Sequence, residues 1–267
     1  MADPLPSSRA VSGPPLRPPS LIDAVVQRLQ GDILSGRYPP GSYLPPEREL
    51  AEELSVTRTS LTQAFARMRE LGLVETKHGV GTLVCDYERI GGLVLLPVLV
   101  AADAPGWLKE IFEVRREVGA LVAARAARNA TADQLAALRQ AHGAVRAAAD
   151  ADGVQLAECD VHRVLARATG NRVYGLTVNA VLAAYLPVRQ FLQEPFRDPV
   201  EAADRLTPLV DAVLAKDADA AHSYALAYLA VTERMMIGRL VHGESYPRDD
   251  VQRSDVRSRA TARGRRP

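Results

Sequence analysis

The chain has 267 residues, of which 47% are hydrophobic and 24% are charged, and these values are ordinary for a soluble globular protein. This length is sufficient for two modest domains, each with its own core. The formal net charge is only +1, so overall charge neither requires nor excludes a polyanionic partner such as DNA. Aromatic residues make up 5% and alanine is abundant, which predicts mainly helices packed closely through small side chains.

The sequence carries no sign of secretion or of a membrane span. Its two cysteines, Cys85 and Cys159, lie far apart without a CxxC pair, and no secretion signal is present. A reducing cytoplasm fits best. The longest apolar run, residues 90–102, contains Pro97 and two glycines and is too short to cross a bilayer. We interpret it as a linker followed by a buried helix.

Both ends of the chain have compositions that disfavour folding. Residues 1–19 contain six prolines and few large apolar groups, which predicts a disordered arm. Residues 244–267 are predicted to form a disordered basic tail, because seven arginines accumulate there with almost no large apolar side chains. The tail is interpreted as solubilising, and sequence-independent affinity for DNA is the alternative.

The first helices are marked by their start and stop residues. Ser20 is a suitable N-cap for a helix with an apolar side chain at every fourth position, and Gly36 ends this helix. After a turn rich in proline and glycine, a second helix opens with Glu47 in its first turn and runs to about Leu54.

A third helix and a hairpin complete the first predicted domain. Thr57 is a good N-cap for this helix, and Gly72 stops it. Residues 73–77 and 82–84 then read as two short strands around a glycine-rich turn. Three helices followed by such a hairpin predict a winged helix-turn-helix DNA-binding domain over residues 20–86.

The remainder is predicted to be helical. Residues 87–106 form a linker and a connecting helix, and residues 107–243 form an all-helical domain for effector binding and dimerisation. The expected helices span residues 107–129, 131–149, 154–169, 173–193, about 200–216 and 218–241. The predicted fold class is therefore mainly α, with an N-terminal winged helix-turn-helix and a C-terminal all-α bundle.

The start of the third helix carries the candidate DNA-reading residues, because a recognition helix contacts bases from its N-terminal turn. These residues are Thr57, Arg58, Thr59 and Ser60. The Arg58 guanidinium suits a guanine edge, and the hydroxyls suit phosphate oxygens or base edges. Arg48 adds a second guanidinium. The hairpin tip at His78 and Gly79 allows the backbone to approach the duplex closely.

Local charge placement must carry this prediction, because the domain is not basic overall. Residues 20–86 contain seven basic and nine acidic side chains. Binding would then depend on Arg48, Arg58 and Lys77 converging on one face, with most carboxylates turned away. Taken singly, these features are also explained by a capped helix start and a simple hairpin turn.

Between Gly41 and Val84 the chain contains the runs Leu-Pro-Pro-Glu-Arg-Glu-Leu-Ala, Val-Thr-Arg-Thr-Ser-Leu, Gly-Leu-Val and His-Gly-Val-Gly-Thr-Leu-Val. This pattern resembles the N-terminal domain of the GntR family of bacterial regulators. The resemblance implies DNA contacts at Arg48, Thr57, Arg58, Thr59, Ser60, His78 and Gly79. The chain departs from many relatives at Thr62, where they carry another arginine, and at Val80, where some carry a basic or polar residue.

The helical part resembles the FadR branch of the same family. The resemblance rests on Val-Arg-Arg-Glu at residues 114–117 and on Ala-Thr-Gly-Asn-Arg-Val-Tyr-Gly-Leu at residues 168–176. Many members of that branch bind a divalent metal through one acid and three histidines. The resemblance therefore raises two questions, whether a metal binds and which effector the domain takes.

We expect no metal site. Glu158 and His162, four residues apart on one helix, suit two ligand positions. The two other positions correspond to Leu206 and Tyr228, which are poor ligands. A rearranged site that recruits the histidines of the last helix is the alternative.

The fatty-acid-responsive type of the branch lacks the metal and binds long-chain acyl-CoA, which makes acyl-CoA or a fatty acid the expected effector. Such a pocket needs an apolar tunnel and cations for the phosphates. The resemblance implies the effector-binding residues Arg115, Tyr174, Tyr185, Arg189, Leu206, Tyr224 and Tyr228. Ala225 and Thr232 depart from that type, which has glycine and tryptophan there. The alternatives are that these residues are bundle core, or that the effector is a small carboxylate, with or without metal.

The predicted protein is a homodimeric DNA-binding regulator of lipid-metabolism genes whose partners are double-stranded operator DNA and the effector. No cofactor is expected apart from acyl-CoA as a possible effector. An enzyme would have to use the cluster Glu158, Cys159, Asp160 and His162. The sequence has no companion motif, such as a phosphate loop or a nucleophile elbow, so no catalytic residues are assigned.

Overall fold

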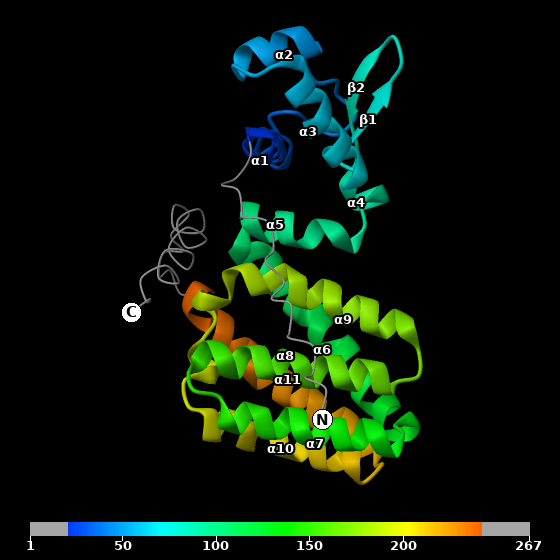
Figure 1. Ribbon diagram of the computed structural model, residues 1–267, viewed down its shortest axis with the longest axis vertical. Coiled ribbons are helices and arrows are strands. Elements are labelled where there is room, and N and C mark those ends of the chain that lie inside the picture. The colour runs from blue at the N-terminus through cyan, green and yellow to red at the C-terminus, as the bar shows by residue number, and fades with distance from the viewer. Residues whose placement is uncertain (1–20, 242–267) are drawn as a thin grey trace, which may run out of the picture. The chain divides into compact units, whose positions relative to one another are not determined.

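The computed structural model describes residues 21–241, and Figure 1 shows their elements. The chain divides into two compact units, Met1–Gly91 and Gly92–Pro267. The predicted arm, the predicted tail and the proposed cap Ser20 lie outside the described residues. None of the described helices is long and apolar enough to cross a membrane.

The first unit consists of helices, one hairpin and a closing helical turn, in the order α1 Leu21–Leu34, α2 Glu47–Glu53, α3 Arg58–Glu70, β1 Val74–Lys77, β2 Gly81–Val84 and α4 Tyr87–Ile90. The two strands are antiparallel, with Val74 opposite Val84 and Lys77 opposite Gly81. Tyr43 adds an isolated bridge to β2 through Leu83. This arrangement confirms the predicted helix-turn-helix with its wing.

The core of this unit explains why its helices hold together despite their shortness. Leu29 of α1, Leu50 of α2, and Leu61 and Phe65 of α3 are at most 2% exposed. Burial of each such side chain contributes about 1.5–3 kcal/mol. The turn between α2 and α3 places Ser55 at φ 54°, a left-handed conformation, so that α3 can start in a new direction. The core thereby fixes α3 relative to α1 and α2.

The second unit is entirely helical. Its elements are the 3-10 turn η1 Leu93–Leu95, α5 Leu96–Ala102, α6 Ala104–Asn129, α7 Ala132–Ala147, α8 Ala151–Ala168, α9 Arg172–Tyr185, the 3-10 turns η2 Leu186–Phe191 and η3 Glu194–Phe196, α10 Pro199–Leu214 and α11 Ala218–Val241. Side-chain caps start most of the long helices. Thr131 and Gln134 form a capping box at α7, and Asp198 accepts from two backbone N–H groups at α10.

The helices α6 and α11 form the most extensive helix pair of this unit and run side by side (Figure 1). Small residues allow their close approach, because a Cβ built on Gly119 would collide with the Leu229 side chain. Ala120, Ala123 and Ala127 of α6 are fully buried beside it. The abundant alanine therefore packs helices closely, as the composition predicts.

The predicted helix over residues 173–193 is wrong in its second half. The α-helix ends at Tyr185, and the chain continues as the 3-10 turn η2. Pro187 explains the change, because it has no N–H to donate to the carbonyl four residues earlier and its ring crowds that carbonyl. The prediction of a linker with one connecting helix over residues 87–106 was too simple. The elements α4, η1, α5 and the start of α6 all lie in this range.

We predict that Thr131→Ala lowers the free energy of unfolding by about 1 kcal/mol, because the variant loses the capping box of α7 while Thr131 is exposed and loses no packing. Chemical denaturation of the full chain measures the change. Ser223→Ala is the matched control, since Ser223 is exposed within α11 and its loss should change stability by less than about 0.5 kcal/mol. Equal effects of the two substitutions would contradict the capping argument.

Candidate functional site

The N-terminal turn of α3 is capped by one of the predicted DNA-reading residues. The Thr57 Oγ1 accepts a hydrogen bond from the Ser60 backbone N–H at 3.1 Å, and the two hydroxyls lie 3.0 Å apart. The prediction of Thr57 as the N-cap is therefore confirmed. Arg58 and Thr59 are exposed immediately after it. The two capping hydroxyls are thus engaged within the helix start, whereas Arg58 and Thr59 face solvent.

Arg48 lies beside the start of α3. A surface groove is lined by Leu21, Arg48, Ala51, Glu52, Ser55, Val56, Thr57 and Arg58. The groove brings the two predicted guanidinium groups together although ten residues separate them in sequence. It is formed mainly by α2, the turn that follows it and the start of α3. This is the placement that a helix-turn-helix needs to present two cations to one duplex.

The wing places the other two predicted residues at its tip. His78 and Gly79 are exposed in the turn between β1 and β2. Gly79 has φ 74°, which a residue with a side chain rarely adopts, so the tight tip depends on glycine. Val80 follows with 67% of its surface exposed. The tip therefore offers one imidazole and exposed backbone, as a minor-groove or phosphate contact requires.

Ion pairs within the first unit engage some of its arginines and leave others available for DNA. These pairs are Arg28–Asp32, Arg37–Asp32, Arg37–Glu53 and Arg67–Asp23. They neutralise three carboxylates. In the described part of the chain, neither Arg48 nor Arg58 belongs to an ion pair. A domain with an excess of acidic residues can thus still present positive charge at one face.

Gln63 was not among the predicted DNA-contact residues. This residue is exposed on α3, one turn after Thr59. A glutamine at that place suits the donor and acceptor pair of adenine in the major groove. The spacing of four residues along the predicted recognition helix was the available signal.

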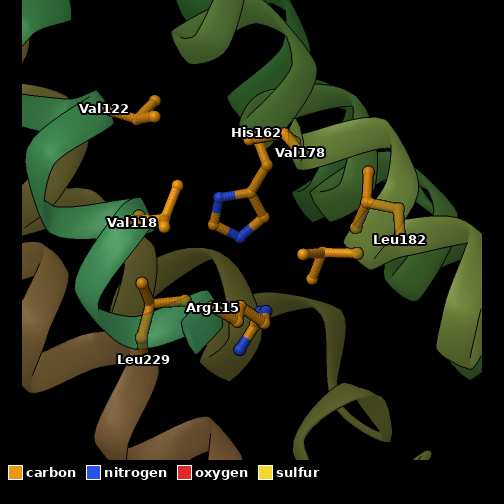
Figure 2. Close-up of a pocket in the computed structure, with 9 residues that line it drawn as sticks. Arg115, Val118, Val122, His162, Val178, Leu182 and Leu229 are labelled. Carbon is orange, nitrogen blue, oxygen red and sulfur yellow. The ribbon is translucent and has the colours of Figure 1, made fainter. Parts of the chain in front are cut away.

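The second unit contains a small pocket of about 30 Å³ that is partly open to solvent (Figure 2). Its lining residues are Arg115, Val118, Gly119, Val122, His162, Val178, Val181, Leu182 and Leu229. They come from α6, α8, α9 and α11, so the pocket lies inside the helical bundle. Six valine and leucine side chains form most of the wall. Only Arg115 and His162 are polar, which gives the pocket one polar end and an apolar remainder.

A buried hydrogen-bonded cluster supports the polar end. Arg115 Nη2 lies 3.3 Å from Glu158 Oε1, and Arg115 Nη1 lies 3.4 Å from the Thr232 hydroxyl. The His162 Nε2 also lies 3.3 Å from Glu158 Oε1. The Tyr228 hydroxyl is a further hydrogen-bond partner of Glu158. The cluster links α6, α8 and α11 through polar side chains that burial would otherwise leave unpaired.

The cluster keeps Glu158 ionised. Burial by itself raises the pKa of Glu158, but the hydrogen bond and charge of His162, the charge of Arg115 and the bond to Tyr228 outweigh it, so the pKa lies below its ordinary value. A carboxylate whose pKa falls on folding stabilises the protein above its unfolded pKa, and this stabilisation is lost as the pH falls through the folded pKa.

Four of the seven predicted effector residues lie in the core or in the buried cluster. Arg115 lines the pocket. Tyr228 bonds to Glu158 behind it, and Tyr185 is 1% exposed with its hydroxyl 3.4 Å from the Cys159 sulfur. Leu206 is fully buried in the bundle core. Leu206 and Tyr185 thus belong to the bundle core, which was the alternative interpretation of these positions.

The structure does not bring the three remaining predicted residues to this pocket. Arg189 forms a bidentate pair with Asp152, at 2.6 and 3.2 Å. Tyr174 lies beneath the Arg125 guanidinium, and Tyr224 is 47% exposed. Spacing along a helix does not say which neighbour covers each face, so effector contacts of these three residues stay a prediction. His162 was considered as a metal ligand and as part of a possible catalytic cluster but not as an effector contact, yet its ring projects into the pocket (Figure 2).

Across residues 21–241, no group of three or more histidine, cysteine, aspartate or glutamate side chains is arranged to hold a metal ion. Glu158 and His162 instead bond to each other, and Arg115 occupies the remaining side of the carboxylate.

A winged helix-turn-helix joined to a helical unit with a buried pocket defines a DNA-binding transcriptional regulator with a sensing domain. Comparison with known families supports this class. Residues 21–84 match the family described as "Bacterial regulatory proteins, gntR family", and residues 110–230 match the FCD domain. The chain belongs to the GntR family of transcriptional regulators, with an FCD effector-binding domain.

Individual relatives agree with this assignment. An uncharacterized HTH-type transcriptional regulator of Mycobacterium tuberculosis is 38% identical over 77% of this chain and 85% of its own length. A fatty acid metabolism regulator protein of Serratia proteamaculans is 32% identical over 60% of this chain and 66% of its own length. The chain thus spans just under two thirds of the latter protein.

Among solved structures, one titled "Lar controls the expression of the Listeria monocytogenes agr system and mediates virulence" matches with a TM-score of 0.52. The match covers 84% of this chain and 99% of the other, at 16% identity. At this identity the similarity shows the fold alone.

We predict that Arg58→Ala lowers the affinity for the operator by about 1–3 kcal/mol, because the variant loses a guanidinium at the exposed start of α3. The operator is first selected from a random duplex library, and fluorescence anisotropy then measures both proteins. Arg69→Ala is the matched control, since Arg69 is exposed in the last turn of the same helix. A larger loss for Arg69→Ala would overturn the placement of the reading residues.

We predict that Glu158→Leu lowers the free energy of unfolding by about 3–5 kcal/mol, because Arg115 is then buried without its carboxylate. The double variant Arg115→Met with Glu158→Leu should recover most of the loss, since neither charge remains. Denaturant titration of the three proteins measures this. A double variant no more stable than the single one would show that the pair itself does not account for the loss.

Proposed function

We propose that the protein binds its operator as a homodimer and that an effector with an acyl chain, a fatty acid or its CoA thioester, changes this binding from the pocket of the second unit. The regulated genes would serve lipid metabolism. The groove with Arg48 and Arg58 and the wing tip supply the DNA contacts. The pocket of α6, α8, α9 and α11 supplies the sensor.

The shape and chemistry of the pocket carry the proposal. Its wall is formed by valine and leucine side chains, and its only two polar lining residues, Arg115 and His162, share one end. An acyl chain gains from leaving water for such a wall, by about 0.8 kcal/mol per buried CH₂. Its carbonyl or carboxyl end then meets the polar end. The relative named fatty acid metabolism regulator protein agrees with this effector class.

Dimerisation follows from how a regulator of this design reads DNA. One α3 offers a single first turn to the major groove, which is a small reading surface. Two copies related by a twofold axis read two half-sites whose separation is set by the protein's symmetry. The operator should accordingly be a pseudo-palindrome.

The effector acts through thermodynamic linkage. A ligand changes operator affinity only by the difference between its affinities for the DNA-binding and the other conformation. The pocket is suited to such a difference, because the close contact of Gly119 with Leu229 lies in its wall. A chain that inserts there has to displace Leu229. The displacement would change the packing of α6 against α11.

A small carboxylate is the second candidate effector, and the size of the pocket favours it. A cavity volume of about 30 Å³ is far below that of ligand pockets, which span about 300–1,000 Å³. Any effector therefore has to open the pocket, and a small one has to open it less. Arg189, the cation expected to hold phosphates, is already paired with Asp152. A series of acids of increasing chain length separates the candidates, because only an acyl-chain effector gains affinity with each added methylene.

We predict that Val178→Phe abolishes the response to an acyl-chain effector, because the larger ring fills the pocket that Val178 lines. Operator affinity without effector should stay within about twofold, since α9 carries none of the DNA-contact residues. Gel-shift titration with a fatty acid and with its CoA thioester measures both quantities.

Leu176→Phe is the matched control on the same helix. Leu176 is 68% exposed and does not line the pocket, so this variant should respond as the unsubstituted protein does. Retention of the response in Val178→Phe would overturn the assignment of the pocket, whereas DNA binding would be unaffected by that result.

A further inference from the structure

The helix α6 carries an exposed stripe, although it packs against five other helices of the second unit, namely α5, α8, α9, α10 and α11. Successive positions of the stripe are three or four residues apart, so they share one face of the helix. The exposed side chains on this face, which we call the α6 stripe, are Glu110, Val114, Glu117, Leu121, Arg125 and Arg128.

The middle of the α6 stripe is apolar. Val114 and Leu121, two turns apart, are 48% and 49% exposed. One exposed aliphatic side chain on a surface needs no explanation. Two of them on the same face of a helix that is otherwise well packed are typical of a surface that another protein covers.

The charges of the α6 stripe are sorted by sign around Leu121. Its acidic residues precede Leu121 and its basic residues follow it. Within residues 21–241, neither Glu117 nor Arg125 belongs to an ion pair. The Arg125 guanidinium lies over the Tyr174 ring, 5.5 Å from its centroid, and the Arg125 side chain remains exposed. Both charges are therefore available to a partner.

This order of charges makes the α6 stripe complementary to itself. If a twofold axis passes through Leu121, the two copies of α6 run antiparallel. Each residue before Leu121 then faces the residue equally far after it on the other copy. Glu117 and Arg125 lie four residues on either side of Leu121, which is about 6 Å along the helix. Glu117 of each copy thus faces the partner's Arg125, and Leu121 faces Leu121.

We propose that a second copy of this chain docks on the α6 stripe, with the two helices antiparallel, Leu121 on the twofold axis and Glu117 paired with the partner's Arg125. The inference rests on the homodimer proposed above and specifies its interface in the second unit. A twofold dimer uses one patch on both copies, so the patch has to complement itself. The α6 stripe meets this condition with an apolar centre and charges toward its rim.

The helix that carries this interface also forms one wall of the pocket. Val118 and Val122 line the pocket, and each directly follows a residue of the α6 stripe. Gly119, between them, lies against Leu229 of α11. An effector that opens the pocket displaces this contact and so acts on the helix that holds the partner. Effector binding and the geometry of the dimer are thereby linked through α6.

Charge reversal at the two paired positions tests the interface. Sedimentation velocity of the full chain at a series of concentrations measures the dissociation constant of the dimer. Glu117→Arg and Arg125→Glu should each raise this constant by about tenfold or more, because two attractive pairs become repulsive. An equimolar mixture of the two variants should return to within about threefold of the unsubstituted protein, because every pair across the axis is again of opposite sign.

Arg139→Glu is the matched control, because Arg139 is exposed in the middle of α7 and lies outside the α6 stripe. Its dissociation constant should stay within about twofold of the unsubstituted value. Circular dichroism verifies that each variant is helical. The recovery in the mixture needs no assumption about folding, since it uses the same two proteins that fail alone.

A cross-link tests the position of the axis. Leu121→Cys places one thiol of each copy at the proposed axis, so a short bis-maleimide should join the two chains. Leu156→Cys is the matched control, since Leu156 is 40% exposed on α8 and lies outside the α6 stripe. The two native cysteines, Cys85 and Cys159, are buried.

The outcomes separate this inference from the proposed function. If the unsubstituted protein is a monomer, both the inference and the proposed homodimer are wrong. A dimer that neither charge reversal weakens, or a mixture that stays as weak as its components, would overturn the inference and leave a homodimer through another surface. Cross-linking of Leu156→Cys in place of Leu121→Cys would have the same meaning.

Discussion

A charge buried in a helical bundle needs a partner of opposite charge, and the pairing of Arg115 with Glu158 meets this need across α6 and α8. The sensing unit depends on it. Tyr228 and Thr232 extend the contact to α11, so three helices share one polar cluster. The same cluster forms the end of the pocket through His162. The cluster therefore supplies the polar groups that an effector would meet in this pocket.

The DNA-binding unit has to attract a polyanion although its acidic residues outnumber its basic ones. Ion pairs on the helices hold Asp23, Asp32 and Glu53 against arginines that serve the fold. The guanidinium groups of Arg48 and Arg58 remain at the groove where α2 meets α3. Placement of a few cations, and not total charge, therefore governs the attraction of this unit for a phosphate backbone.

The elements were predictable wherever local chemistry decides them. Thr57 caps α3 because its side chain accepts a bond from a backbone N–H three residues on, a contact that sequence spacing reveals. The end of α9 was mispredicted because Pro187 was passed over within a strongly apolar run. Tyr224 and Arg189, which were predicted to bind the effector, do not line this pocket. The sequence predicted which helical segments contain them. The exposure of Tyr224 and the pairing of Arg189 with Asp152 depend instead on neighbouring elements.

The sequence by itself determined the class of the protein, its winged helix-turn-helix, its helical second unit and the residues at the start of α3, because these follow from caps, turns and apolar periodicity over short distances. The tertiary structure alone decided the pocket. Arg115 and Glu158 are 43 residues apart, and Arg115 and Thr232 are 117 apart. Only packing of helices distant in the chain determines which side chains share a cavity, and hence which charges cancel there.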